Sequence, residues 1–336
     1  MSVSEVVMIT GASAGVGRAT AIAFARTGAR IGLLARGRAG LEGAWRDVEV
    51  AGGEAVIFEA DVADADAVER AAASLEDAFG PIDIWVNNAM ASVFSPVKEM
   101  TADDFKRVTE VTYLGVVHGT LAALRRMLPR DHGSIVQVGS ALAYRGIPLQ
   151  AAYCAAKHAV QGFCDSLHAE LLHDNSQVRL TMVQLPAMNT PQFDWVKSRL
   201  PRKAQPVPPV FQPEIGADAI VWAAHHGRRE LYVAMPTAAA IIGDKIASGV
   251  ADRYLAANGY EAQQTGEAED PQRAHNLWEP VDRDEDFGAH GRFDPVARST
   301  SYEVWPAEHH GAMAVIIGSI VAAVTTGLFL NRRWRR

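Results

Sequence analysis

Residues 6–20 read VVMITGASAGVGRAT, and this stretch decides the fold. A short β-branched run, Val6–Thr10, leads directly into a glycine-rich turn, and residues 18–25 have the pattern of a helix. Glycines at such a turn let the main chain approach a pyrophosphate without Cβ atoms in the way, and the positive end of the helix dipole faces the anion. The turn therefore predicts a phosphate cradle built from Thr10, Gly11, Ser13, Ala14, Gly15, Val16 and Gly17.

The same strand-then-helix pattern repeats along the chain to about residue 235. Short apolar runs alternate with longer, alanine-rich amphipathic segments, which is typical of β-α units around a parallel sheet. We therefore expect an α/β fold of the Rossmann type, with a doubly wound, seven-stranded parallel sheet and helices on both faces. The expected strands are Val6–Thr10, Arg30–Ala35, Ala55–Phe58, Ile82–Val86, Gly133–Gly139, Val178–Gln184 and Leu231–Ala234.

Composition and charge narrow the class of function. The 336 residues are 49% apolar and carry a formal net charge of -7, which indicates a globular protein without the basic surface that nucleic-acid binding needs. A small molecule is the expected partner. Cys154 and Cys164 lack metal-ligand spacing, and the histidine pairs at 225–226 and 309–310 lack a third ligand, so we expect no metal. The first residues lack a basic n-region and an apolar h-region, which predicts a cytoplasmic body.

Three further motifs follow the glycine-rich turn along the chain. Asn87-Asn88-Ala89 follows the fourth expected strand, Ser140 ends the fifth, and Tyr153-x-x-x-Lys157 begins the next helix. In this order and at these separations the motifs resemble the short-chain dehydrogenase/reductase family over about residues 4–257. The resemblance implies an enzyme that moves hydride between a nicotinamide cofactor and an alcohol or carbonyl compound, and it implies a homodimer or tetramer.

The spacing of Tyr153 and Lys157 supports this chemistry on physical grounds. Residues four apart at the start of a helix point from one face into the same cleft. A nearby ammonium favours the phenolate and so lowers the pKa of a tyrosine, which is about 10 unaided. Ser140 lies at the sheet edge where doubly wound folds bind ligands, and its hydroxyl would hold the substrate oxygen while Tyr153 transfers the proton. Taken singly, these residues would be interpreted as a strand-end cap and as surface packing.

The resemblance also assigns further site residues. It implies that Lys157 and Tyr153 contact the nicotinamide ribose, and it places Asn87, Ala89, Pro186 and Thr190 at the cofactor. The chain departs from the family pattern at three positions, one of which is Ala187, where the family has a glycine after the proline. Met90 replaces a glycine, and we expect it to add an apolar wall to the cleft. Thr112 replaces an asparagine that helps hold a water relay to the lysine, and we expect its hydroxyl to serve catalysis there.

The second expected strand indicates which cofactor binds. Ala35 stands where an NAD-selective enzyme places an acidic residue on the ribose 2′-hydroxyl. Arg36 offers a permanently charged fork that matches a 2′-phosphate, so we expect NADP(H) over NAD(H), with a solvated surface charge as the alternative interpretation of Arg36. Asp61-Val62 resembles the family's adenine-contacting pair, although Asp61 is also suited to be a helix N-cap.

The remaining segments extend the catalytic domain, which we place at residues 1–257. Residues 186–213 are rich in Pro, Lys and Arg and show neither the helical nor the strand period of apolar residues, which predicts a loop that acts as a lid over the substrate. Residues 237–257 have the pattern of an amphipathic helix. Residues 258–311 carry twelve Asp and Glu against four Arg, which predicts an acidic, partly ordered linker. Its aromatic residues are expected to pin it to the body, namely Trp278, Phe287, Phe293 and Trp305.

Residues 312–330 form an uncharged apolar stretch of about the length that crosses a bilayer core, and a basic tail, 331–336, follows. A spanning helix would put that tail on the far side from a cytoplasmic body, against the positive-inside tendency. Three interpretations stay open, which are a membrane-spanning helix, a helix at the inner leaflet, and a helix packed on a partner subunit.

Together these patterns predict an NADP(H)-dependent oxidoreductase that interconverts a secondary alcohol with a ketone or aldehyde. We expect an apolar or lipid-like substrate and a cytoplasmic body that residues 312–330 tether to a membrane. The alternative is a cofactor-binding sensor or scaffold with little turnover, which the Met90 and Thr112 departures favour and the intact Ser140, Tyr153 and Lys157 disfavour.

Overall fold

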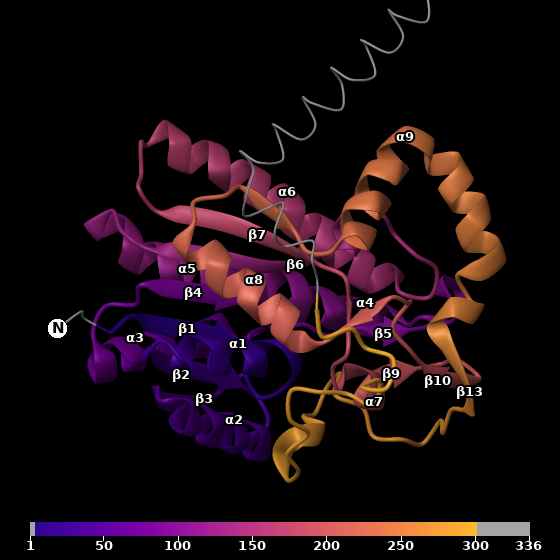
Figure 1. Ribbon diagram of the computed structural model, residues 1–336, viewed down its shortest axis with the longest axis horizontal. Helices are drawn as coiled ribbons and strands as arrows, with labels where there is room; N and C mark the ends of the chain where they lie inside the picture. The colour runs from indigo at the N-terminus through magenta and orange to yellow at the C-terminus, as the bar shows by residue number, and fades with distance from the viewer. Residues whose placement is uncertain (1–3, 301–336) are drawn as a thin grey trace, which may run out of the picture.

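A computed structural model describes residues 4–300, and all seven expected strands pair in one parallel sheet (Figure 1). The order is β12-β7-β6-β4-β1-β2-β3, so the order in which strands are added to the sheet reverses between β1 and β4, where a doubly wound sheet has a crevice at the carboxyl ends of its strands. The predicted fold is confirmed, with strand ends that differ by one or two residues from those expected. The strands are β1 (Val6–Thr10), β2 (Arg30–Ala35), β3 (Glu54–Glu59), β4 (Ile84–Asn87), β6 (Ser134–Ser140), β7 (Arg179–Leu185) and β12 (Glu230–Tyr232).

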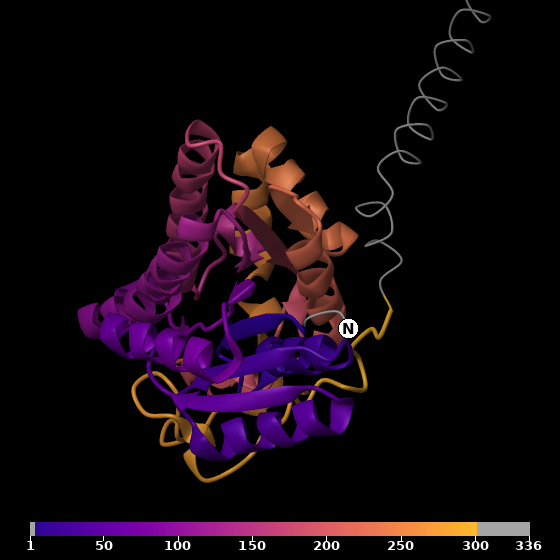
Figure 2. The same ribbon diagram turned by 90° about the vertical axis from the view of Figure 1, so that its left-hand side faces the viewer.

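Helices cover both faces of this sheet (Figure 2). One face packs against α1 (Gly15–Ala25), α2 (Arg38–Ala51) and α8 (Pro213–His225), and the other packs against α3 (Ala65–Phe79), α4 (Ala102–Thr109), α5 (Gly115–Met127) and α6 (Ala151–His173). Strand β1 shows why both faces are apolar. Val7 and Ile9 are buried in the first core and Val6 and Met8 in the second, because successive side chains of a strand point to opposite faces.

The segment predicted as a lid, residues 186–213, contains short elements that tie it to the body. Strand β8 (Ala187–Met188) pairs with β11 (Val210–Phe211), and β9 (Lys197–Ser198) pairs with β5 (Val93–Phe94). Between them lie α7 (Gln192–Trp195) and β10 (Arg202–Ala204). These pairings give the segment a fixed course over the end of the sheet.

Helix α9 (Met235–Asn258) follows β12 and confirms the helix expected at residues 237–257. The chain then continues as what we call the C-terminal extension, residues 259–300, which includes β13 (Gln264–Ala268) paired antiparallel with β10. Figure 1 shows the extension in yellow, returning along the end of the sheet beside α7.

Residues 259–300 of the linker predicted at residues 258–311 pack against the catalytic body. Two of the expected aromatic anchors are confirmed. The ring of Phe287 meets Trp195 at 4.9 Å between centroids, and that of Phe293 meets Phe193 at 5.7 Å. Trp278 stays 46% exposed and lies beside the guanidinium of Arg107. Trp305 lies outside the described residues.

Within residues 4–300, no helix combines the length and apolar character that crossing a bilayer requires. The candidate membrane helix, 312–330, and the basic tail, 331–336, lie outside the described residues. In the same described part of the chain, no three His, Cys, Asp or Glu side chains are grouped to hold a metal ion. Cys154 and Cys164 are buried free thiols.

Candidate active site

The turn between β1 and α1 requires glycine at several positions. Gly11 and Gly15 have φ of +66° and +58°, which is the left-handed region that favours glycine. A Cβ on Gly17 would lie 2.1 Å from the carbonyl oxygen of Gly11. The N-cap residue of α1, Ala14, makes no side-chain capping bond, and in the first turn the N–H of Gly15 donates to the carbonyl oxygen of Gly288. The positive end of the helix dipole faces the groove that Gly15 and Val16 line. The turn fits the pyrophosphate of a dinucleotide.

Thr10 and Asn88 join the carboxyl ends of β1 and β4 beside this turn. The Thr10 hydroxyl accepts the main-chain N–H groups of Asn88 and Ala89 at 3.0 and 3.1 Å. Nδ2 of Asn88 donates to the carbonyl oxygens of Thr10 and Gly11 at 3.0 and 3.1 Å. These bonds fix the floor of the crevice at the point where the strand order reverses.

The side chain of Asn87, which the resemblance placed at the cofactor, does not line the crevice. Its side chain accepts from Trp85 Nε1 at 2.9 Å and donates to Thr120 Oγ1 at 3.1 Å, and the residue is 1% exposed. The neighbouring Asn88 lines the crevice instead. Successive side chains of β4 face opposite sides, so only one asparagine of the pair can reach the crevice.

Most of the other predicted cofactor residues line one groove along the carboxyl ends of the strands, which we call the cofactor cleft. Thr10 and Gly17 are buried and do not line it. Pro186 lines a second cavity, which adjoins the cofactor cleft and contains Ser140, Tyr153 and Lys157. The predicted residues that line the cofactor cleft are Gly11, Ser13, Ala14, Gly15, Val16, Arg36, Asp61, Val62, Ala89 and Thr190.

Arg36 has partners that the sequence did not predict. Its guanidinium donates to the main-chain carbonyl oxygens of Trp278, at 2.8 Å, and of Asn276, both in the extension. Asp61 accepts from Arg107 and lies 3.9 Å from Arg36. The extension therefore forms one wall of the cleft beside Arg36 and Asp61, and it holds the arginine that was expected to face a phosphate. We call this part of the cleft the adenosine end, because the sequence predicts the adenosine half of the cofactor there.

The extension also contributes two residues to the lining of the cleft that the sequence analysis did not predict, Asn276 and Asp282. A signal for them exists in α2 and the residue before it, where Gly37, Gly40 and Gly43 recur at every third position. A Cβ on Gly37 or Gly40 would lie 1.9 or 2.6 Å from a carboxylate oxygen of Asp282. This glycine stripe is thus a groove that receives acidic side chains of the extension.

Ser140, Tyr153 and Lys157 share the second cavity, which we call the catalytic cavity, and its volume is about 410 Å³. Ser140 ends β6, and the other two residues lie one turn apart at the start of α6. The Lys157 Nζ donates to the carbonyl oxygen of Val138 at 2.6 Å and lies 5.6 Å from the centre of the Tyr153 ring. The structure thus brings together the three residues that the sequence predicted to act together.

Burial sets the protonation of these groups. Burial raises the pKa of the Tyr153 phenol, and a hydrogen bond with Ser140 opposes that rise. Burial also lowers the pKa of Lys157 to about 8, so the amine keeps its proton at neutral pH but loses it within reach of ordinary buffers. A charged Lys157 beside the phenol is the group that can bring Tyr153 toward proton exchange.

Thr112 is placed differently from its expected role at the water relay. It lies in a π-helical turn, Glu110–Leu114, and is fully buried. Its hydroxyl donates to the carbonyl oxygen of Ala91 at 2.8 Å and accepts from the N–H of Ala91 at 2.9 Å. These two bonds occupy the hydroxyl with the main chain behind Met90, so we assign Thr112 a positioning role in place of the predicted catalytic one.

The catalytic cavity is mainly apolar, and it continues into the cofactor cleft because Val16, Asn88, Met90 and Thr190 line both. Met90 therefore stands at the junction, in agreement with the apolar wall that the sequence predicts. The walls come from three parts of the chain, which are the loop between β6 and α6, the lid segment and α9. Their side chains include Leu142 and Ile147 from the loop, Phe193 and Val207 from the lid segment, and Pro236 and Leu255 from α9.

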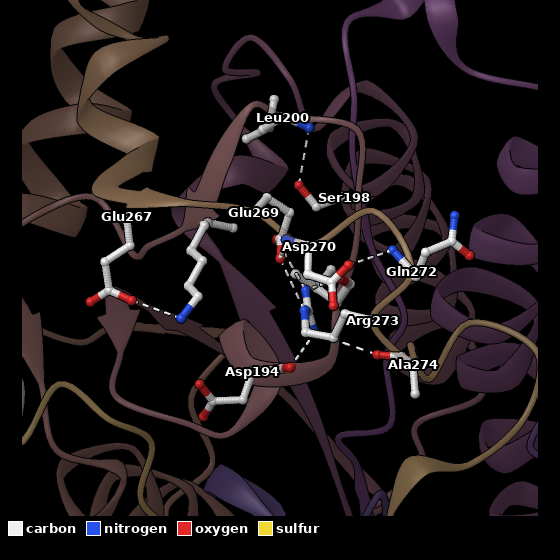
Figure 3. Close-up of polar contacts among 12 residues, drawn as sticks. Asp194, Ser198, Leu200, Glu267, Glu269, Asp270, Gln272, Arg273 and Ala274 are labelled. Atoms are coloured by element: carbon white, nitrogen blue, oxygen red, sulfur yellow. Dashed lines mark hydrogen bonds and ion pairs between the residues drawn. The ribbon is translucent and has the colours of Figure 1, made fainter.

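Ionic contacts fix the lid segment over this cavity. Asp104, which is 2% exposed, accepts from Lys197 at 2.8 Å and from Arg199. Arg273 of the extension donates to the carbonyl oxygens of Asp194 and Val196, and it pairs with the carboxylate of Glu269, four residues earlier in the extension (Figure 3). The lid is thus clamped from the body on one side and from the extension on the other.

Comparison with known proteins gives relatives along the whole chain. Residues 5–199 match the family model described as short chain dehydrogenase. The chain is 30% identical over 322 residues to the uncharacterized oxidoreductase YxnA of Bacillus subtilis, an alignment that covers 95% of this chain and 89% of that protein.

Solved structures with the same fold hold either form of the nicotinamide cofactor. An alcohol dehydrogenase from the archaeon Thermococcus sibiricus, complexed with 5-hydroxy-NADP, is 26% identical with a TM-score of 0.59 and covers 68% of this chain and 95% of its own. A short chain dehydrogenase from Mycobacterium paratuberculosis, bound to NAD, is 25% identical with a TM-score of 0.59 and covers 69% of this chain and 97% of its own. The fold is therefore compatible with both cofactors.

Proposed function

Because this chain belongs to the short-chain dehydrogenase family, and is thus an oxidoreductase that acts on CH–OH groups, we propose that Tyr153 exchanges the proton while a nicotinamide cofactor exchanges the hydride. The observation that carries the proposal is that the catalytic cavity adjoins the cofactor cleft, with lining residues in common. Ser140, Tyr153 and Lys157 in the first are thereby placed next to the glycine-rich turn in the second, which fits a pyrophosphate.

Each residue has a distinct role in the proposed reaction. Ser140 donates a hydrogen bond to the carbonyl oxygen of the substrate and holds it beside the phenol. Tyr153 gives its proton to that oxygen during reduction and takes it back during oxidation. Lys157 supplies a positive charge beside the phenol, which favours the phenolate that this exchange produces.

We propose an apolar, lipid-like ketone, aldehyde or secondary alcohol as the substrate. The exposed surface of the catalytic cavity is mainly apolar, with leucine, isoleucine, valine, proline and phenylalanine side chains in its lining, and its polar groups include Ser140 and Tyr153. Such a cavity favours a molecule with one oxygen at the reacting carbon and an apolar remainder.

The form of the cofactor depends on the adenosine end of the cleft. The NADP(H) preference predicted from the sequence requires an Arg36 guanidinium that is available to a 2′-phosphate. In the structure this guanidinium donates to main-chain carbonyl oxygens of the extension. The proposed function requires a nicotinamide dinucleotide, and the groups that the extension brings to this end decide its form.

We also propose that the body works in the cytoplasm and that residues 312–330 associate with a membrane, as their apolar character predicts. The family homodimer or tetramer stays a prediction. Sedimentation of lysed cells tests the membrane proposal. We expect the full chain to pellet with the membranes and a chain ended at residue 300 to stay in the supernatant, and a full chain in the supernatant would contradict it.

Turnover by the purified full chain tests the function. We expect oxidation of NADH or NADPH with apolar ketones or aldehydes, and a loss of about 10²- to 10⁴-fold in kcat for Tyr153→Phe. Cofactor binding to this variant should change little. The control is Tyr260→Phe, since Tyr260 is 46% exposed and outside the cavity lining. Tight cofactor binding with no turnover on any substrate would instead support a sensor or scaffold, and full activity of Tyr153→Phe would refute the mechanism.

A further inference from the structure

We propose that Asp282, a residue of the C-terminal extension, selects the cofactor by accepting from the ribose hydroxyls of the adenosine half, so that the protein prefers NAD(H) to NADP(H). The inference rests on the proposed function, because it needs a nicotinamide dinucleotide in the cofactor cleft. It opposes the NADP(H) preference that Arg36 predicts in the sequence.

The first argument is the position of the carboxylate. An NAD-selective Rossmann protein places an acidic residue at the end of β2, and this chain has Ala35 there. Asp282 lines the same cleft as Ala35 and is 7% exposed. Its carboxylate lies against the first turn of α2, at 1.9 Å from where a Cβ of Gly37 would be and 2.6 Å from that of Gly40. An acidic group is thus delivered to the end of β2 from a distant part of the chain.

The second argument is the state of Arg36, the cation that would meet a 2′-phosphate. Its Nη1 donates to the carbonyl oxygen of Trp278 at 2.8 Å, its Nη2 donates to that of Asn276, and it lies 3.9 Å from Asp61. A 2′-phosphate would have to draw Arg36 away from these oxygens and would lie beside the Asp282 carboxylate. Two negative groups in a partly buried cleft repel each other, whereas a ribose hydroxyl donates to a carboxylate.

The third argument is that Asp282 is held from both sides. Before it, Leu277 is fully buried in the core and its carbonyl oxygen accepts from Arg107 Nε at 3.0 Å. After it, Asp286 pairs with Arg18, and the carbonyl oxygen of Gly288 accepts from the N–H of Gly15 at 3.2 Å. The loop that carries the carboxylate is therefore fixed on the phosphate-binding helix itself, and the acceptor is in place before the cofactor arrives.

The test is the dissociation constant of NADH and of NADPH for the full-length protein, measured by fluorescence titration at one ionic strength without substrate. We expect NADH to bind at least about tenfold more tightly than NADPH, since a charged hydrogen bond is gained in one complex and a repulsion in the other. Asp282→Asn removes the charge and keeps the shape. This variant should bind NADH several-fold more weakly and NADPH more tightly than the wild type does, which brings the ratio of the two dissociation constants close to one.

The matched control is Asp284→Asn, which changes the net charge equally at an exposed position two residues away and should leave the ratio unchanged. Gly37→Ala is a second variant in case Asp282→Asn does not fold, because its Cβ would displace the Asp282 carboxylate and shift the ratio in the same direction. A wild-type preference for NADPH, or an unchanged ratio in Asp282→Asn, would refute the role of Asp282 alone. Failure of both cofactors to bind would refute the proposed function, and the role of Asp282 with it.

Discussion

The glycine stripe of α2 allows one sharp test of how the extension docks. Gly43 lies in the interior of this helix, where alanine is ordinarily about 1 kcal/mol more favourable than glycine. A Cβ at this position would lie 2.0 Å from Oδ2 of Asp286 and 2.8 Å from Nη1 of Arg18. We therefore expect Gly43→Ala to destabilise the full-length protein, against the propensity of the helix.

The magnitude follows from the Arg18–Asp286 pair. Ordinary contact with a Cβ begins near 3.4 Å, so the Asp286 carboxylate must retreat by about 1.4 Å, and this breaks the bond from Arg18 Nη2 that is now 3.2 Å long. Hydrogen bonds to charged groups contribute about 1.5–3 kcal/mol, and Asp286 is 29% exposed, so we take the loss as about 2–3 kcal/mol. Subtracting the helix gain of about 1 kcal/mol leaves a net loss of about 1–2 kcal/mol.

Urea unfolding of the purified full chain measures this loss. The control is Gly162→Ala in α6, an exposed helical glycine whose added Cβ meets nothing within 4 Å, and it should stabilise the protein by about 1 kcal/mol. In an Asp286→Ala background the cost of Gly43→Ala should disappear, because the carboxylate that the Cβ displaces is gone. If Gly43→Ala stabilises the protein as much as Gly162→Ala does, the extension does not dock in the stripe.

Three further substitutions test the site and its supports. Lys157→Met should abolish turnover yet stabilise the protein at pH 7 by about 1–2 kcal/mol. Burial lowers the pKa of Lys157 to about 8, so below that pH the buried charge destabilises the folded protein by about 3 kcal/mol. The hydrogen bond from Lys157 to Val138, which the variant loses, offsets about 1 kcal/mol of this cost. The gain in stability of Lys157→Met should shrink between pH 8 and 10.5, the pKa of lysine in the unfolded chain. Equal stabilities of the variant and the wild type at pH 7 would contradict this prediction. Asp104→Asn should cost about 2 kcal/mol in urea unfolding. Burial raises the pKa of Asp104, but hydrogen bonds from Lys197 and Arg199 outweigh this and hold the pKa below its usual 3.8. The contribution is therefore present above pH 3.8 and is lost as the pH falls through the folded pKa, so a cost of Asp104→Asn that does not shrink on acidification would refute the clamp. Met90→Ala widens the junction of the two cavities, and steady-state kinetics should show a KM for apolar substrates raised about tenfold with little change in kcat, whereas an unchanged KM would place the substrate elsewhere.

The sheet could be predicted from the sequence because its signals are local. Each buried parallel strand is an apolar run of a few residues, and in β1 the alternation of Val7 and Ile9 with Val6 and Met8 serves the two cores in turn. The glycine-rich turn and the Tyr153–Lys157 pair are equally local, since strand, turn and helix geometry fix where these side chains point. For these elements a pattern of ten residues carries the whole prediction.

The adenosine end of the cleft could not be predicted in this way, because its groups come from segments far apart. Arg36 looked available to a phosphate because nothing near it in sequence shows that Asn276 and Trp278 supply its acceptors. The prediction named Asn87, whereas Asn88 lines the crevice, because neighbouring side chains at the end of β4 point to opposite faces. In both cases the direction of the side chain depends on contacts that the neighbouring sequence does not determine.

A consequence follows for how cofactor preference is inferred in this family. The family model ends at residue 199, whereas the carboxylate that faces the end of β2 is at residue 282. If that carboxylate binds the ribose, docking of the extension and binding of NAD(H) stabilise each other, because each favours the same closed arrangement of Arg36, Asp282 and Asp286. NADH should then raise the stability of the docked extension more than NADPH does. Limited proteolysis measures that coupling, when the protection of residues 276–288 is compared between the two cofactors at equal saturation. Equal protection by NADH and NADPH would show that docking of the extension does not depend on which cofactor binds.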